Sequence, residues 1–412
     1  MLRLIFVAAL AAGLPFQPSS LDPRSGKKIS DLRFREDGTF QITVFSDFHL
    51  GELSAVPDGP AQDAKTLQVM REVLDYEKPD FVVLNGDLVT GESAPRRKNA
   101  HYIDHLVKPL VERNLTWGST YGEHDHTFTL HGGSLLRHER RFAGSRTRKM
   151  VNLYHAGTSN YYVPVYAADC VNVKRQKCHP ELLLWFFDSR GGYDLGRSTR
   201  YGNPAPLPNW VDASVVRWFQ KTNQKLSRAA QRDIPALAFV HIPITAAAAL
   251  QKDGLDPHKN PGIDHDVPVS HQGMRWCNER KYDLGGLRCD KDGLDTQFMT
   301  ALATTPGLRG LFFGHDHGNT WCSKWQSRIP GTDVTAKGIN LCYGQHTGYG
   351  GYGNWIRGGR QIVVNRQSED LGIQTHIRLE DGRTVGAVNL NSTLNEDSYP
   401  ATPNDETFLK LS

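Results

Sequence analysis

Five short stretches of the chain combine Asp, Glu and His residues in patterns that could hold metal ions. They are Ser46-Asp47-Phe48-His49, Gly86-Asp87, Gly122-Glu123-His124-Asp125, His241-Ile242-Pro243 and Gly314-His315-Asp316-His317. Imidazole and carboxylate ligands suit zinc, manganese or iron, so the residue types indicate a metal site without fixing the metal. Each stretch is weak evidence when taken singly, because a lone Asp-x-His is more often a polar strand end and a lone Gly-Asp is usually a turn.

Each of these stretches directly follows a segment that could form a buried strand. The segments are 42–45 (ITVF), 81–84 (FVVL), 115–120, 236–240 (ALAFV) and 308–313 (LRGLFF), and 182–187 (LLLWFF) has the same character. Apolar residues at helical spacing predict helices over 63–76, 102–111, 211–226 and 296–303. The first two strands and the helix between them form a β-α-β unit, which implies a parallel strand pair. The whole pattern predicts an α/β sandwich with mixed sheets in one domain.

In open α/β sheets, ligands bind beyond the carboxyl ends of the strands, so the five stretches predict one shared metal cluster. Asp47 and His49 are two residues apart and leave an extended chain on the same side. Gly86 allows a tight turn beside Asp87. A carboxylate placed between two ions about 3.5–4 Å apart would set their spacing, and a water held by both could attack a phosphate ester.

The order of these motifs, from about Phe40 to Asn319, resembles that of the calcineurin-like metallophosphoesterases. Segments 318–322 (GNTWC) and 341–355 (LCYGQHTGYGGYGNW) look like the secreted fungal and plant branch related to purple acid phosphatases. The resemblance implies a sandwich of two mixed β-sheets flanked by helices, two divalent or trivalent ions (Mn, Zn or Fe) and hydrolysis of phosphate esters. It implies one metal bound by Asp47, His49, Asp87 and His317, and a second bound by Asp87, Glu123, His241 and His315. His124 would face the substrate, and Asp125 would orient His124.

Two positions depart from the pattern of this family. Glu123 stands where the family has asparagine, and an ionised glutamate cannot donate a hydrogen bond to phosphate. Its negative charge near a phosphate predicts reduced or altered activity. Thr90 stands where purple acid phosphatases have the tyrosine that binds ferric iron and gives the colour. The sequence therefore predicts a colourless enzyme.

The start of the chain and the cysteines indicate export. Residues 1–18 are typical of a signal peptide, with Arg3 before the apolar run 4–12, although a buried first strand is the alternative. Six cysteines suit three local disulfides, which we expect as 170–178, 277–289 and 322–342, whereas a zinc site is disfavoured because no Cys-x-x-Cys is present. Asn114 and Asn391 begin glycosylation triplets of a secreted glycoprotein.

The remaining expectations concern organisation and partners. We expect one domain over 28–395, insertions near 189–208 and 251–295, and a C-terminal tail over 396–412. The net charge of +4 is too small to imply a nucleic-acid partner, and no later apolar run is long enough for a membrane helix. His126 and the arginines 190, 197 and 200 are expected in exposed loops, and segment 343–352 in a close-packed turn, with substrate contact by His346 or Tyr349 as the minority interpretation.

Three functions remain open from the sequence. A phosphatase acting on small phosphate monoesters is favoured. A phosphodiesterase or nucleotide hydrolase is the alternative within the same chemistry, because specificity lies in loops around the metals. A secreted binding protein with an impaired site is the alternative from another class, and Glu123 is the residue that motivates it. The oligomeric state is not determined by these patterns.

Overall fold

A computed structural model describes residues 30–52, 59–94, 99–176, 178–274, 294–329, 331–368 and 371–409. The expected signal peptide, 1–18, and the expected Cys277–Cys289 pair lie outside these residues. Within the described residues, none of the helices has the length and apolar character needed to span a bilayer.

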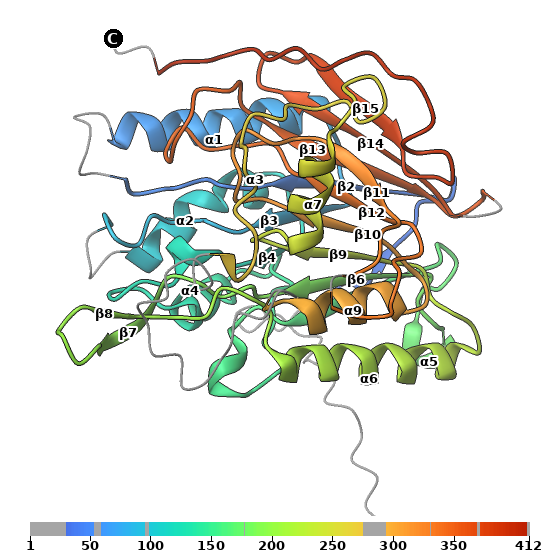
Figure 1. Cartoon of the computed structure of the whole chain (residues 1–412). Coiled ribbons are helices and arrows are strands. Elements are labelled where there is room, and N and C mark those ends of the chain that lie inside the picture. Colours follow the sequence, from blue (N-terminus) through green and yellow to red (C-terminus); the bar gives the residue numbers. More distant parts are fainter. Residues whose placement is uncertain are drawn as a thin grey trace, which may run out of the picture.

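Two large mixed β-sheets form the centre of the fold (Figure 1). One has the strand order β15-β14-β13-β2-β3-β4, and the other has the order β1-β5-β6-β9-β10-β12-β11. The first consists of β15 (Thr384–Asn389), β14 (Gly372–Leu379), β13 (Gly358–Asn365), β2 (Thr39–Phe45), β3 (Phe81–Asn85) and β4 (Trp117–Thr120). The second consists of β1 (Leu32–Arg33), β5 (Tyr161–Tyr166), β6 (Leu182–Phe187), β9 (Ala236–Val240), β10 (Leu308–Phe313), β12 (Ile339–Tyr343) and β11 (Cys322–Trp325).

Helices cover the outer faces of the two sheets. On the side of the first sheet lie α1 (Gly59–Tyr76), α2 (Tyr102–Leu106), α3 (Lys108–Glu112) and α4 (Gly132–Glu139). On the side of the second sheet lie α6 (Ala213–Ala230), α7 (Thr245–Asp253) and α9 (Thr296–Thr304), with the short α5 (Val173–Gln176) near α6 in Figure 1. The expected sandwich of two mixed β-sheets flanked by helices is therefore confirmed.

Apolar side chains from both sheets fill the space between the sheets. Phe81 of β3 contacts Phe186 of β6, whose ring stacks on Phe239 at 5.2 Å, and Phe239 stacks on Phe312 at 5.5 Å. These residues come from strands that the sequence identifies as continuous apolar runs. Such runs are buried on both faces, which explains why the strands read as uniformly hydrophobic.

The predicted elements agree closely with the structure. β2 and β3 are adjacent parallel strands that α1 connects, as expected of a β-α-β unit. The predicted helix over 102–111 is divided into α2 and α3 at Val107, because Pro109 at the start of α3 has no N–H to continue the first helix. Disulfides 170–178 and 322–342 are confirmed, and the second joins two directly opposed residues of β11 and β12.

The expected insertion 189–208 contains the two-stranded hairpin of β7 (Tyr193–Ser198) and β8 (Pro204–Pro206), which projects at one side of the molecule in Figure 1. Part of the second expected insertion, 251–295, lies outside the described residues. The segment after 395 packs against the domain, since Tyr399 N–H donates to the His258 carbonyl and Glu406 forms a β-bridge with Trp355.

Candidate metal centre

All seven expected metal-binding side chains follow the carboxyl ends of strands β2, β3, β4, β9 and β10. Four of them, Asp47, His49, Asp87 and His315, have positive φ angles between 49° and 77°. The left-handed region is uncommon for residues other than glycine and often occurs at functional sites. The backbone therefore turns sharply after β2, β3 and β10.

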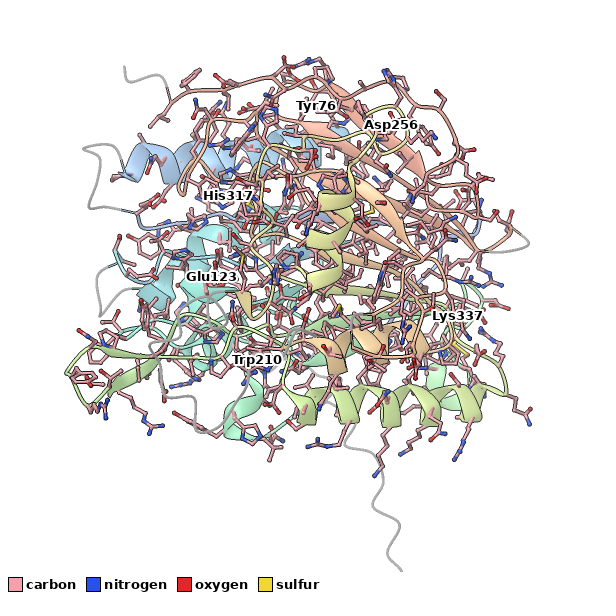
Figure 2. The ribbon with its side chains drawn as sticks, in the orientation of Figure 1. Tyr76, Glu123, Trp210, Asp256, His317 and Lys337 are labelled. Atoms are coloured by element: carbon pink, nitrogen blue, oxygen red, sulfur yellow. A yellow bond between two sulfur atoms is a disulfide. The ribbon has the colours of Figure 1, made fainter. Side chains whose placement is uncertain are left out.

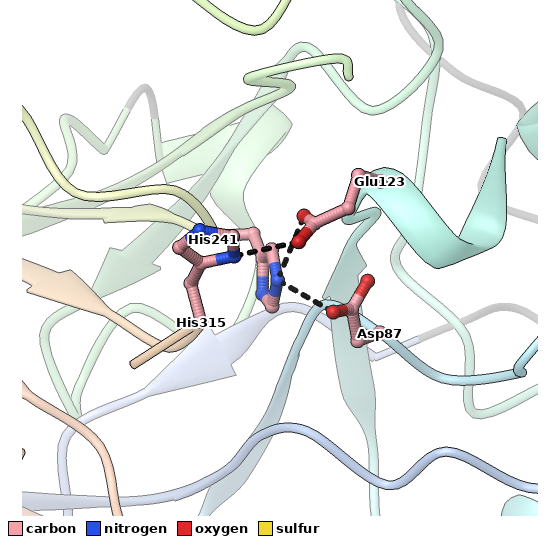
Figure 3. Close-up of side chains that lie close together, drawn as sticks. All are labelled: Asp87, Glu123, His241 and His315. Atoms are coloured by element: carbon pink, nitrogen blue, oxygen red, sulfur yellow. Dashed lines mark ion pairs between the residues drawn. The ribbon is translucent and has the colours of Figure 1, made fainter. Parts of the chain in front are cut away.

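One half of the cluster consists of Asp87, Glu123, His241 and His315 (Figure 3). The Nδ1 atom of His315 lies 2.7 Å from Glu123 Oε1. The Nε2 atom of His241 lies 3.0 Å from Asp87 Oδ2 and 3.3 Å from Glu123 Oε2. One potential ligand atom from each residue falls within 4.8 Å of all the others, which is compact enough for a single ion.

The other half consists of Asp47, His49 and His317. The Nε2 atoms of His49 and His317 face each other at 3.2 Å, and Asp47 Oδ1 lies 3.7 Å from His317 Nε2. Asp87 adjoins both halves, because its Oδ2 lies 3.8 Å from His49 Nε2 as well as 3.0 Å from His241 Nε2. Figure 2 labels one residue from each half, Glu123 and His317.

The hydrogen bonds of the imidazoles show how well this cluster suits cations. The Nδ1 atoms of His241 and His317 lie 2.8 Å from the backbone carbonyls of Asn85 and Tyr352. A carbonyl only accepts, so each Nδ1 carries a proton and each Nε2 is the atom turned towards the cluster. Burial acts to lower the pKa of His241, but Asp87 and Glu123 hold it well above its ordinary value, so a metal ion would displace a proton from its Nε2. His241 Nε2 and Glu123 Oε2 form a buried ion pair at 3.3 Å, and among the described residues neither atom makes a hydrogen bond of good geometry. Imidazole nitrogens that face carboxylate oxygens within so small a space fit a metal ion.

The two halves differ in charge. Burial acts to raise the pKa of Glu123, but His315 and His241 hold it well below its ordinary value. Burial acts to lower the pKa of His315, but Glu123 raises it to about 9. In the other half, burial lowers the pKa of His49 to about 4 and raises that of Asp47 to about 6. The Glu123 half thus attracts positive charge strongly, and the His49 half presents neutral imidazoles.

His124 lies at the exposed edge of the cluster, with its side chain 36% exposed. Its backbone N–H donates to Asp87 Oδ1 at 3.0 Å, and its Nδ1 lies 3.1 Å from Glu92 Oε2. Burial acts to lower the pKa of His124, but Asp87 and Glu92 raise it to about 10. A protonated imidazole in this place could bind a phosphate oxygen or give up a proton.

The expected contact of Asp125 with His124 is replaced by the contact with Glu92. The carboxylate of Asp125 is fully buried and accepts the backbone N–H groups of Leu88, Val89 and Gly122 at 3.0–3.1 Å. It thereby fixes the turn after Asp87 to the turn that carries His124. The sequence could not distinguish the two carboxylates, because only the turn after β3 brings Glu92 to the imidazole.

Asn85 is a supporting residue that the sequence analysis did not identify. Its side chain donates to the carbonyls of Val240 and Phe312 and accepts from Thr120 Oγ1, so it joins β3 to β4 and to the second sheet. Its own carbonyl orients His241. The signal for this residue in the sequence was its position, as a polar residue directly after the apolar run 81–84. Such hydrogen bonds to ligating histidines fix the ring orientation.

Two glycines allow the close approach of these elements. A Cβ on Gly86 would lie 2.3 Å from His241 Nδ1, and a Cβ on Gly122 would lie 2.3 Å from Asp87 Oδ1. Both distances are far inside van der Waals contact, so a side chain at either position would displace the cluster.

Several residues outside the cluster differ from expectation. His126 is 2% exposed, with its Nε2 3.6 Å from Asp188 Oδ2, so its expected place in an exposed loop is wrong. Arg190 is also buried, where it donates to the carbonyls of Trp210 and His155. His346 is buried behind His317, and the hydroxyl of Tyr349 contacts Glu380 and Thr407. Arg197 and Arg200 lie exposed, as expected.

Known proteins share this sequence pattern over most of the chain. Residues 40–319 match the family described as calcineurin-like phosphoesterase. Two Arabidopsis thaliana relatives are named "Probable inactive purple acid phosphatase 28" and "Probable inactive purple acid phosphatase 29". The first is 28% identical and aligns over 80% of this chain and 76% of its own. The second is 26% identical and aligns over 85% of each.

A solved structure of a dimetal phosphatase from Danio rerio aligns with 11% identity and a TM-score of 0.45, covering 85% of this chain and 98% of that one. The family match covers more than half of the chain and spans all five strand ends of the cluster. The chain therefore belongs to the calcineurin-like phosphoesterase family.

Proposed function

We propose that this protein is an exported metal-dependent phosphatase that hydrolyses small phosphate monoesters. One observation carries the proposal. Seven Asp, Glu and His side chains converge from five strand ends, and the buried His241 Nε2 lies 3.0 Å from Asp87 Oδ2 and 3.3 Å from Glu123 Oε2.

In this proposal Asp47, His49, Asp87 and His317 hold one ion, and Asp87, Glu123, His241 and His315 hold the other. Two manganese, zinc or iron ions held there would supply an activated water and positive charge for the phosphate oxygens. The side chains and backbone of the protein would position these ions. Asp87 sets the spacing of the two halves, and the backbone carbonyls of Asn85 and Tyr352 keep two imidazoles in the tautomer that binds a metal.

His124 is proposed as the group that contacts the ester. Its exposed edge faces outward beside the cluster, and Glu92 holds the opposite side of the ring at 3.1 Å. The imidazolium would stabilise charge on the phosphate and protonate the leaving alkoxide. Glu92 would orient this ring, and solvent would restore the proton of His124 after each turnover. Asp125 would act indirectly, through the backbone that carries His124.

A phosphodiesterase or nucleotide hydrolase is the alternative within this chemistry. Comparing kcat/KM for a phosphate mono-ester and its matched bis-ester separates the two. A secreted binding protein is the second candidate, and two observations favour it. Glu123 replaces the family asparagine, and the two Arabidopsis relatives carry the word "inactive" in their names. The two disulfides are compatible with export in either case.

The deciding experiment is phosphate-monoester hydrolysis by the protein reconstituted with manganese, zinc or iron. Asp87→Asn removes the shared charge with little change in shape and serves as the control. We expect turnover in the natural protein and a loss on the order of 10²–10³-fold in the variant, as for the removal of one strong electrostatic group. Folded protein that binds two ions and shows no turnover with any of the three metals would favour the binding protein.

A further inference from the structure

A second cluster of metal-ligating side chains lies between α2 and α4, and it shares no residue with the centre described above. It consists of His101, which directly precedes α2, Asp104 within α2, and His138 in the last turn of α4. His138 Nε2 lies 2.8 Å from Asp104 Oδ2, and His101 Nδ1 lies 3.6 Å from the same oxygen. The two imidazole rings meet edge to face, with their centroids 4.8 Å apart.

These separations suit a tetrahedral zinc ion. Zinc binds imidazole nitrogen and carboxylate oxygen at 2.0–2.2 Å, which places neighbouring ligand atoms about 3.4 Å apart. Here one atom from each residue falls within 4.8 Å of the other two. His101 and Asp104 are three residues apart and lie on the same helical face, so the ligands meet without a change in the backbone.

We propose that His101, Asp104 and His138 form a zinc site that joins α2 to α4, with a water molecule as the fourth ligand. The side chain of His101 is 62% exposed, which leaves the position of the fourth ligand open to solvent. The side chain of His138 is only 10% exposed. α2 follows the turn that carries Glu92, and α4 follows the turn that carries His124. An ion here would therefore connect the two helices that lead away from the rim of the candidate active site.

The neighbouring charges predict the affinity of this site. The carboxylate of Asp104 offsets part of the charge of the ion. The positive charge of Arg141 disfavours zinc binding, because its Nη1 lies 3.1–3.2 Å from both ring nitrogens of His138. Arg141 must move aside when His138 binds zinc. We therefore expect Arg141→Gln to tighten zinc binding and Asp104→Asn to weaken it, which a purely structural hydrogen-bond network would not predict.

Residue-resolved labelling of histidines tests the site in the full-length protein. Diethylpyrocarbonate modifies accessible neutral imidazoles, and mass spectrometry locates each modified ring. Zinc alone, added stepwise to metal-stripped protein, should protect His101 and His138 with one shared midpoint. His105, one turn further along α2 and exposed, should keep its labelling rate and is the internal control. Magnesium, which prefers oxygen ligands, should protect none of the three.

The variants decide the outcome. Asp104→Asn keeps the side-chain shape and should raise the zinc midpoint at least about tenfold. Arg141→Gln should lower it, and His105→Ala should leave it unchanged. Equal protection of His101 and His105, or the same midpoint in Asp104→Asn and the natural protein, would overturn the proposal. Because labelling reports each ring separately, this result is independent of metal binding at the Asp87 centre and of phosphatase activity.

Discussion

Glu123 and Glu139 are both glutamates withdrawn from solvent, but their surroundings differ completely. Glu139 is fully buried and accepts hydrogen bonds from Trp117, Ser119, Tyr121, Ser145 and Thr147. All five donors are neutral, and together they satisfy both oxygens. Glu123 instead faces two imidazoles, with its Oε1 2.7 Å from His315 Nδ1 and its Oε2 3.3 Å from His241 Nε2. A carboxylate surrounded by neutral donors stabilises the fold, whereas a carboxylate that faces only imidazoles can share a metal ion with them.

The largest expected effect that tests this comparison is on stability. Glu139→Ala would leave buried donors without a partner, so we expect the free energy of unfolding to fall by about 3–4 kcal/mol. Glu123→Ala should lower it by less than Glu139→Ala does in the presence of a chelator, because His315 and His241 can lose their protons when the carboxylate is removed and so leave no unpaired buried charge. Chemical denaturation of both variants measures the difference. Similar losses at the two positions would break the comparison.

Metal removal should destabilise the protein through the Glu123 cluster. An ion present at about 100 times its Kd stabilises the folded state by about 2.7 kcal/mol. We therefore expect a chelator to lower the Tm of the natural protein and of Glu139→Gln by similar amounts. Asp87→Asn should respond less, since it has already lost the shared ligand. An unchanged Tm in the natural protein after complete metal removal would contradict the assignment.

Glu77 extends the comparison to a buried carboxylate with charged partners. Burial acts to raise its pKa, but hydrogen bonds from His376, Arg378 and Gln41 lower it from 4.5 to about 2. A lowered folded pKa contributes stability above pH 4.5 that is lost as the pH falls towards 2. We expect Glu77→Gln to cost about 2 kcal/mol at pH 7 and progressively less below pH 4.5. A difference independent of pH would contradict this.

A smaller effect is expected from restoring the family residue. Glu123→Asn removes a negative charge near the proposed phosphate position. Two unit charges about 4 Å apart repel by roughly 4 kcal/mol at an effective dielectric of 20, and the metal ions should offset much of this. We expect kcat/KM for a phosphate monoester to rise about tenfold, equivalent to about 1.4 kcal/mol. Glu123→Gln, which removes the same charge and keeps the length of the side chain, is the matched control. An unchanged kcat/KM in both variants would contradict the charge effect.

The smallest expected signal is optical. Thr90 Oγ1 lies 3.2 Å from His49 Nδ1, where the related purple enzymes have tyrosine. A threonine hydroxyl cannot give a tyrosinate-to-iron charge-transfer band, so the iron-loaded protein should be colourless. An absorption spectrum of the pure iron-loaded protein tests this, and a visible band that disappears on iron removal would contradict it.

Much of the fold could be predicted from local patterns. The apolar runs 81–84, 182–187 and 236–240 lie within strands of the two sheets because uninterrupted hydrophobic segments of this length need burial on both faces. The helix predicted over 296–303 from the helical spacing of its apolar residues corresponds to α9. His126 shows the limit of such patterns. A histidine in a polar segment predicts exposure, but Asp188 from another strand end makes its burial possible.

Sequence patterns were sufficient to predict a sandwich with mixed sheets, the parallel β2–β3 pair and the grouping of Asp and His residues beyond the carboxyl ends of the strands. These features follow from periodicity and from the rule that parallel strands end at the same edge. Tertiary packing was needed to show that Glu92 contacts His124, that Asp125 binds backbone, that Asn85 orients His241, and that His101 and His138 meet across two helices. Each of these contacts joins separate segments of the chain, so it depends on packing distances that no local spacing encodes.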